Sequence, residues 1–122
     1  MLTIIIAELS LCAVPSGPPL NFLGSATSSR SIFLTWGSPL FEDQNGVLVG
    51  YTINVTLIET GEYFELHSDA NNLTADSLRP FSMYAFKIAG ETVVGVGTFS
   101  DAIAIMTPED GENGNYNYIC CF

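Results

Sequence analysis

The residues of this chain that could do chemistry centre on one histidine. His67 is the only histidine among the 122 residues, Ser68 and Asp69 follow it directly, and Ser100 lies further along. Serine, histidine and aspartate hydrolyse acyl bonds when the imidazole takes the hydroxyl proton and the carboxylate orients the imidazole. Neighbours on one short loop do not readily adopt that geometry, and no Gly-x-Ser-x-Gly turn presents a serine. The sequence favours a surface histidine, and a small hydrolase is the minor alternative.

Paired carboxylates are the other candidates for catalysis. Glu42 is adjacent to Asp43, and Glu59 lies close to Glu62. General acid–base catalysis needs a cleft that shifts the pKa values of its carboxyl groups. Both pairs fall at predicted turns, where carboxylates are ordinarily solvated. We therefore predict no catalytic residue and no enzyme activity.

No ligand set for a metal or a cofactor is recognisable. The acidic residues of 109–112 follow the last predicted strand, and their spacing differs from that of a calcium-binding EF-hand loop. The Gly95-Val96-Gly97 stretch lacks the lysine and the following helix of a phosphate-binding loop. Cys12, Cys120 and Cys121 lie outside the patterned region, so they form neither a zinc site nor a disulfide within it. We predict no metal and no cofactor.

The composition narrows the range of partners. Thirteen acidic residues against three basic ones give a net charge of −10, and 48% of the residues are hydrophobic. Such a chain can bury a core, so disorder throughout is excluded. Its surface repels phosphate backbones, sulfated polysaccharides and anionic lipid. We predict no nucleic acid, no heparin-like polyanion and no membrane insertion, which leaves a protein ligand or neighbouring repeats.

The elements that would position these residues are short strands. Alternating apolar and polar residues predict strands at Leu20–Ser25, Ser31–Trp36, Gly50–Ile58, Glu62–Leu66, Asn72–Asp76, Tyr84–Gly90 and Ala102–Thr107, with loops at Pro39–Gly46 and Val94–Gly97 and no helix. The pattern is typical of an all-β, seven-stranded antiparallel sandwich of two sheets. The predicted core consists of Phe22, Ile32, Leu34, Trp36, Tyr51, Ile53, Val55, Leu78, Pro80, Tyr84, Phe86, Ile88, Ile103 and Ile105.

The stretch from Leu78 to Tyr84 is the most informative part of the sequence. Pro80 fixes its own φ angle and ends the preceding strand. Tyr84 follows four residues later and begins an alternating apolar run. A tyrosine at such a corner buries its ring and returns its hydroxyl to a backbone group, here expected within residues 77–80. This tyrosine corner predicts an immunoglobulin-like architecture.

Six pieces of the chain carry a family resemblance. They are Pro15–Pro19, Ser31–Trp36, Gly50–Val55, Leu78–Pro80 with Tyr84, Gly95–Ser100 and Thr107–Asp110. With these pieces the chain resembles a fibronectin type III repeat over roughly residues 15–110. The loop Glu42–Gly46 resembles repeats of receptor-type tyrosine phosphatases and sidekick-like adhesion receptors. One departure is Gly90, where such repeats usually carry alanine, and we expect a small gap there.

The resemblance implies a non-catalytic spacer or protein-binding module of extracellular type. The parent would be a larger cell-surface adhesion or receptor protein, with this chain in its ectodomain. Phe33, Phe81 and Phe99 are candidates for exposed apolar contact surface. Asn54 and Asn72 each begin an Asn-x-Thr triplet and are candidate N-glycosylation sites. Asn54 alternates with inward residues, so we expect it to face solvent.

Both ends lie outside the resemblance. Residues 1–14 are apolar, but no Lys or Arg precedes Arg30 and Glu8 interrupts the run, so no convincing signal peptide is present. The run is also too short to span a bilayer. We predict a non-domain segment at 1–14, a domain at 15–110 and an irregular tail at 111–122. Codons for residues 9–14 and 111–112 can resemble splice sites, so a truncated single-exon product with no independent function is an alternative.

Overall fold

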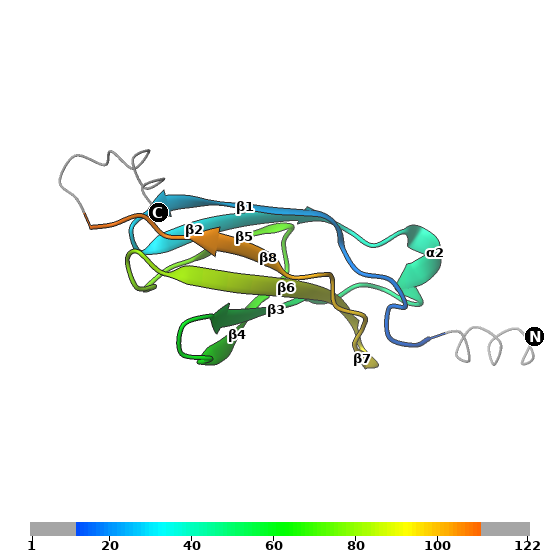
Figure 1. The fold of residues 1–122 in the computed structure, drawn as a ribbon. Helices are drawn as coiled ribbons and strands as arrows, with labels where there is room; N and C mark the ends of the chain where they lie inside the picture. Colours follow the sequence, from blue (N-terminus) through cyan, green and yellow to red (C-terminus); the bar gives the residue numbers. More distant parts are fainter. Residues whose placement is uncertain (1–11, 111–122) are drawn as a thin grey trace, which may run out of the picture.

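A computed structural model describes residues 12–110 of the chain, so the predictions for residues 1–11 and for Cys120 and Cys121 fall outside it. The described elements are β1 (Leu20–Ser28), β2 (Ser31–Gly37), α2 (Phe41–Gln44), β3 (Gly50–Leu57), β4 (Tyr63–Ser68), β5 (Asn72–Ala75), β6 (Met83–Thr92), β7 (Gly95–Val96) and β8 (Ile103–Met106). One sheet has the order β1-β2-β5. The other has the order β4-β3-β6-β7, and β8 also pairs with β6. Figure 1 shows the two sheets as stacked layers, which confirms the predicted all-β sandwich.

Two short elements differ from the sequence prediction. The last residues of β6 turn back at Val93–Val94, and Gly95 and Val96 then pair with Thr92 and Glu91, where a loop was expected. Gly95 has a φ of 151°, which favours glycine. The expected loop at 39–46 contains the single helical turn α2, which ends at Asn45 in the left-handed conformation. These are local additions and leave the two-sheet architecture unchanged.

Strand β3 organises the larger sheet because it is paired on both sides. Tyr51 to Thr56 pair antiparallel with Ser68 to Tyr63 of β4. Gly50 to Leu57 pair antiparallel with Glu91 to Tyr84 of β6. Side chains alternate between faces along a strand, so every second residue of β3, starting at Tyr51, points into the space between the sheets. Their partners in β6 point the same way.

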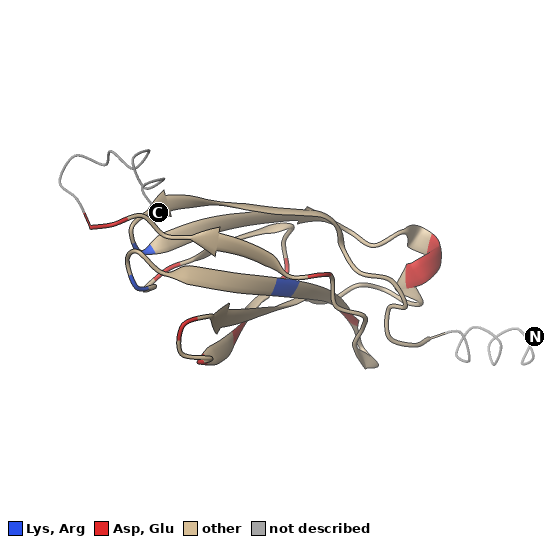
Figure 2. Ribbon diagram, in the orientation of Figure 1, with Lys and Arg blue, Asp and Glu red and all other residues tan. Residues whose placement is uncertain are grey.

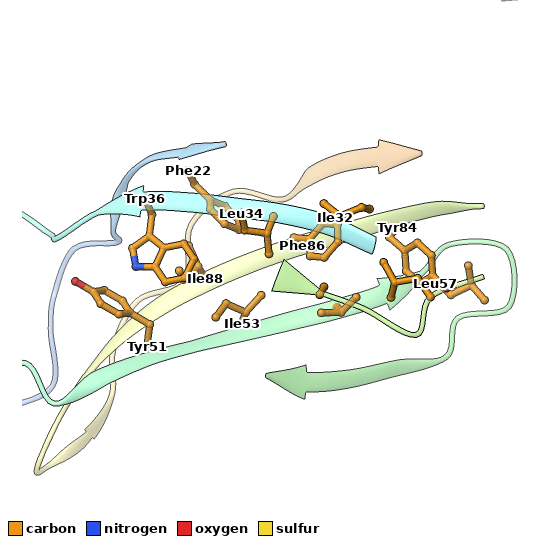
Figure 3. Packing of buried hydrophobic residues seen from close by; sticks show 13 residues of the cluster. Phe22, Ile32, Leu34, Trp36, Tyr51, Ile53, Leu57, Tyr84, Phe86 and Ile88 are labelled. Carbon is orange, nitrogen blue, oxygen red and sulfur yellow. The ribbon is translucent and has the colours of Figure 1, made fainter. Parts of the chain in front are cut away.

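The core fills the space between the two sheets (Figure 3). Trp36 is 5% exposed and makes edge contacts with Phe22 and Tyr51, with ring centroids 6.2 and 5.4 Å apart. The buried apolar side chains are Phe22, Ile32, Leu34, Trp36, Tyr51, Ile53, Val55, Leu57, Ala75, Leu78, Tyr84, Phe86, Ile88 and Ala89. Of the residues expected in the core, Pro80, Ile103 and Ile105 are only half-buried. They lie on the corner and on β8, at the margin of the sheets.

The tyrosine corner has the expected hydrogen bond and one additional residue. The Tyr84 hydroxyl accepts a hydrogen bond from the backbone N–H of Arg79 at 2.8 Å. Thr107, which is fully buried, donates its hydroxyl to the carbonyl oxygen of Arg79 at 2.6 Å and accepts from the Ser82 N–H at 2.9 Å. The residue that follows β8 therefore holds the same corner as Tyr84, through the carbonyl of Arg79 and the N–H of Ser82. Nothing in the sequence pattern singled out Thr107 for this role.

Candidate functional site

The surroundings of His67 are those of a surface side chain on β4. Its Nδ1 lies 3.3 Å from the Thr52 hydroxyl oxygen and 3.8 Å from a Glu91 carboxylate oxygen. Its Nε2 lies 3.9 Å from a Glu65 carboxylate oxygen. The Thr52 hydroxyl donates to Glu91 at 2.8 Å. The imidazole thus faces two carboxylates, and no serine hydroxyl is among its recorded partners in residues 12–110.

The serines of the hydrolase alternative are used for other contacts. The Ser68 hydroxyl donates to the carbonyl oxygens of Ala70 and Asn72, at 3.3 and 3.1 Å. The Ser100 hydroxyl donates to the Asp101 carbonyl at 3.0 Å and accepts from the Ile88 N–H at 3.1 Å. Both hydroxyls hold turns and strand ends. Neither is positioned to pass a proton to His67.

The four candidate acid–base carboxylates lie at the surface or in turns, and the structure brings no two of them together in a cleft. Glu62 lies 3.5 Å from the Arg79 guanidinium at the surface. The Ser16 hydroxyl lies 3.5 Å from an Asp43 carboxylate oxygen, and the Ser16 N–H donates to the Asp43 backbone carbonyl at 2.8 Å. Glu42 and Glu59 are exposed. Within residues 12–110, no three His, Cys, Asp or Glu side chains gather to hold a metal ion.

Asp110 ties the exit of the domain to the β1–β2 turn. Its carboxylate accepts a hydrogen bond from the Ser29 hydroxyl and pairs with Arg30 at 2.8 Å. The Ser29 hydrogen bond, followed by the Arg30 guanidinium, holds the pKa of Asp110 below its usual value. A lowered folded-state pKa means that this contact stabilises the fold above the unfolded pKa and is lost as pH falls through the folded one.

The opposite end of the sandwich, where the chain enters the fold, carries α2 and β7 (Figure 1), and the loops there have exposed apolar side chains. We call this group the end patch: Leu40, Phe41, Val47, Val49, Val93 and Val94. Phe41 is 88% exposed, Val47 80% and Val93 82%. Phe41 and Val47 line a hollow of ≈ 500 Å³, together with Cys12, Glu42 and residues 44–46. Of the end patch, Phe41 and Val47 line this hollow, whereas the other four residues are absent from its lining.

The two loops of the end patch are held together by backbone contacts. The Val49 N–H donates to the Glu91 carbonyl at 2.8 Å. The N-terminal residues complete the junction: the Ala13 N–H donates to the Asn45 carbonyl at 2.8 Å, and the Thr92 hydroxyl donates to the Ala13 carbonyl at 2.7 Å. These hydrogen bonds fix the two loops of the end patch relative to each other. The turn α2, which carries Phe41 of the patch, also carries the acidic residues Glu42 and Asp43 (Figure 2).

Comparison with known proteins now identifies the family, because the fibronectin type III domain matches residues 17–106. This chain belongs to that family. Among curated relatives, it is 33% identical over 105 residues to rat "Cell adhesion molecule DSCAM", covering 80% of this chain and 5% of that protein. It is also 33% identical over 103 residues to "Protein sidekick" of Drosophila melanogaster, covering 78% and 4%. The fibronectin type III domain thus spans about a twentieth of the relatives' length.

Solved structures agree with the fold of this fibronectin type III domain. The FN5 domain of Drosophila Lar is 29% identical, with a TM-score of 0.65, and the match covers 78% of this chain and 98% of that one. A structure of titin domains A168–A170 gives a TM-score of 0.70 at 22% identity, covering 79% and 33%. The predicted family resemblance, including the likeness to sidekick, is confirmed.

The remaining predicted surface residues divide between exposed and covered positions. Phe33 and Phe81 are 37% and 43% exposed, whereas Phe99 is half-buried. Asn72 is exposed on β5. Asn54, expected to face solvent, is half-buried and its Oδ1 is buried without a hydrogen-bond partner. Asn54 lies on the outer face of β3, as alternation predicts, but its exposure is reduced there because Glu65 of β4 and Lys87 of β6 lie directly opposite it.

The end patch was not found from sequence. Its members come from two loops far apart in the chain, and a single exposed Phe41 or Val93 carries no pattern. In the sequence, residues 42–46 stand out for their paired carboxylates and their family likeness, and neither feature indicates an apolar surface. Among residues 12–110 no helix is long and apolar enough to cross a bilayer.

Proposed function

We propose that this domain is a non-catalytic, extracellular-type module of a larger cell-surface adhesion or receptor protein, and that its end patch packs against the module preceding it. The observation that carries the proposal is the position of the patch. The chain joins the fold through Ala13 and Val14, beside the patch, so a preceding module would meet the domain at this end. The relatives are adhesion molecules about twenty times longer than the matched segment.

The exposure of the end patch supports the proposal that another module buries these side chains in the parent protein. Burying one phenylalanine or valine side chain contributes roughly 1.5–3 kcal/mol, from which the cost of holding the two modules together is subtracted. Phe41, Val47 and Val93 together offer several such side chains, and each is more than three-quarters exposed in the isolated domain. Glu42 borders them as a polar rim, the arrangement typical of interfaces between domains. The proposal commits to a neighbouring module as the occupant.

The charge of the chain supports an extracellular protein partner over other classes. With a net charge of −10, the chain repels nucleic acid, heparin-like polymers and anionic membranes. A spacer or binding role needs no catalytic group, and the His67 surroundings supply no activated nucleophile. The proposed function therefore depends on the surface that the domain presents to proteins and on its attachment to neighbouring modules.

Hydrogen exchange would test the contact. We would express the preceding module from the parent transcript joined to this chain, and compare exchange at residues 40–49 and 92–95 with that of this chain alone. The pair should show slower exchange in both loops. The double variant Phe41→Ser/Val47→Ser should abolish the slowing, because it removes the apolar contact. The isolated domain should still fold, because both side chains are exposed in it.

Tyr63→Ser provides the matched control, since Tyr63 is also an exposed aromatic, 64% accessible, on β4 away from the patch. It should leave the slowing intact. Identical exchange in the pair and the single domain would overturn the proposed contact. A parent transcript without a preceding module would favour the truncated-product alternative, and turnover of ester or peptide substrates that His67→Ala abolishes would favour the hydrolase.

A further inference from the structure

The two Asn-x-Thr triplets occupy different structural settings. Asn72 opens the four-residue strand β5, where both Asn72 and Thr74 are exposed and Leu73 between them is half-buried. Strand β5 is at the edge of its sheet and pairs only with β2. Asn72 lies opposite Thr35 in that pairing, and Thr74 lies opposite Phe33. The acceptor amide and the hydroxyl that accompanies it therefore both point away from the core at an open edge.

Asn54 lies in the middle of the other sheet. Its strand is paired on both sides, with Glu65 of β4 and Lys87 of β6 directly opposite Asn54. Its carboxamide oxygen is buried and without a hydrogen-bond partner, and Thr56 is half-buried. A glycan attached at this position would have to leave between the long side chains of two neighbouring strands. The folded domain therefore accommodates a sugar at Asn72 and opposes one at Asn54.

We propose that Asn72 is the N-glycan acceptor of this domain and that Asn54 is left unmodified. The inference rests on the proposed extracellular role, because the reaction takes place in the secretory pathway. The co-substrate is an oligosaccharide carried on a lipid pyrophosphate. The Asn72 amide nitrogen forms a bond to the anomeric carbon of the first sugar, the bond from that carbon to the pyrophosphate oxygen breaks, the amide loses one proton, and the lipid pyrophosphate leaves.

The glycan also shields the edge on which it sits. An edge strand exposes unpaired N–H and C=O groups that can pair with another chain, and proteins usually protect such edges with charges, proline or a cover. Strand β5 has the sequence Asn-Leu-Thr-Ala, which contains neither a charged residue nor a proline. A bulky hydrophilic sugar at its first residue supplies the missing cover.

The site can be tested by directing residues 1–122 into the secretory pathway of a eukaryotic cell with a cleavable leader. The secreted wild-type chain should lose mass on treatment with peptide N-glycosidase, and release in H₂¹⁸O should label position 72. Asn72→Gln and Thr74→Ala should abolish the mass loss. Thr74→Ser, which keeps the acceptor triplet, and Asn54→Gln should both retain it.

A mass loss that persists in Asn72→Gln, or its absence from the secreted wild-type chain, would overturn the assignment. Because the added leader forces secretion, these outcomes do not depend on the end patch or on the native location of the protein, which hydrogen exchange and cell-surface labelling of the parent test separately. Sedimentation tests the shielding: the Asn72→Gln domain, which lacks the glycan and adds no charge, should self-associate at a lower concentration than the glycosylated wild-type domain. Equal self-association would overturn the shielding role.

Discussion

The Tyr84 hydroxyl closes the corner by accepting the Arg79 N–H. Tyr84→Phe keeps the ring, which is 3% exposed, and removes only this 2.8 Å hydrogen bond. We expect the free energy of unfolding to fall by about 1 kcal/mol, rising towards ~3 kcal/mol if the N–H stays buried without a partner. Chemical denaturation measures the loss. Tyr63→Phe, at an exposed position, is the control and should change stability by less than about 0.5 kcal/mol.

Trp36 fills the junction between the sheets through its contacts with Phe22 and Tyr51. Trp36→Ala should lower the free energy of unfolding by about 3–5 kcal/mol, because a large buried ring is replaced by a cavity. That is a large share of the roughly 5–15 kcal/mol that stabilises a small domain. Trp36→Phe should cost clearly less, since the indole Nε1 has no hydrogen-bond partner to lose. An unchanged midpoint for the alanine variant would refute this role.

Gly90 tests whether the core has room for a methyl group. A Cβ built there would lie 3.4 Å from Leu48, 3.6 Å from Pro39 and 3.7 Å from Pro15, all ordinary contacts. We expect Gly90→Ala to raise the free energy of unfolding by about 0.4–1 kcal/mol, because alanine restricts the unfolded chain. In Gly97→Ala the new Cβ would meet the Pro15 carbonyl oxygen, so that variant should destabilise. Thermal melts of both variants decide the sign.

At the scale of elements, the last strand and the corner act as one unit. Thr107 contacts the Arg79 carbonyl, while Tyr84 contacts the N–H of the same residue. Thr107→Val keeps the side-chain shape, and it removes a donor and an acceptor from a fully buried position. We expect a loss of about 1–3 kcal/mol in denaturant unfolding.

A double-variant cycle shows whether the two contacts cooperate. Thr107→Val and Tyr84→Phe share one peptide segment, so their losses should not add. Thr27→Val, on the exposed part of β1, is the control: its hydroxyl shares only a solvent-exposed hydrogen bond with Ser31, so its loss should be smaller than that of Thr107→Val. Strict additivity of the two losses, or a Thr107→Val variant as stable as wild type, would show that the exit strand does not lock the corner.

The elements also show what the sequence could and could not predict. Alternation identified β2, β3 and β6 because each places every second side chain between the sheets, and the proline-to-tyrosine spacing identified the corner. The pairing of Gly95–Val96 was missed because it depends on β6 continuing past its apolar run. The burial of Asn54 and the end patch depend on residues that only the fold brings together. The alternation of apolar and polar residues predicts the strands, whereas the exposure of a side chain depends on the residues that the fold places beside it.

At the scale of the whole molecule, we expect the domain to be autonomous, with its N-terminal boundary slightly earlier than residue 15. Residues 13 and 14 contribute three hydrogen bonds: Ala13 bonds to Asn45 and Thr92, and the Asn45 amide donates to the Val14 carbonyl at 3.0 Å. These contacts connect the incoming chain to both loops of the end patch. A fragment starting at residue 15 loses them all.

We therefore expect the fragment 12–110 to unfold cooperatively with a midpoint close to that of the full chain, and 15–110 to melt several degrees lower. Each lost partly exposed hydrogen bond costs about 0.5–1.5 kcal/mol, and 1 kcal/mol corresponds to roughly 4–8 °C in a domain of this size. Differential scanning calorimetry of both fragments and the full chain makes the comparison. Equal midpoints for the two fragments would show that residues 12–14 only adjoin the fold. Loss of cooperative unfolding in 12–110 would place part of the domain in the outer segments and refute autonomy.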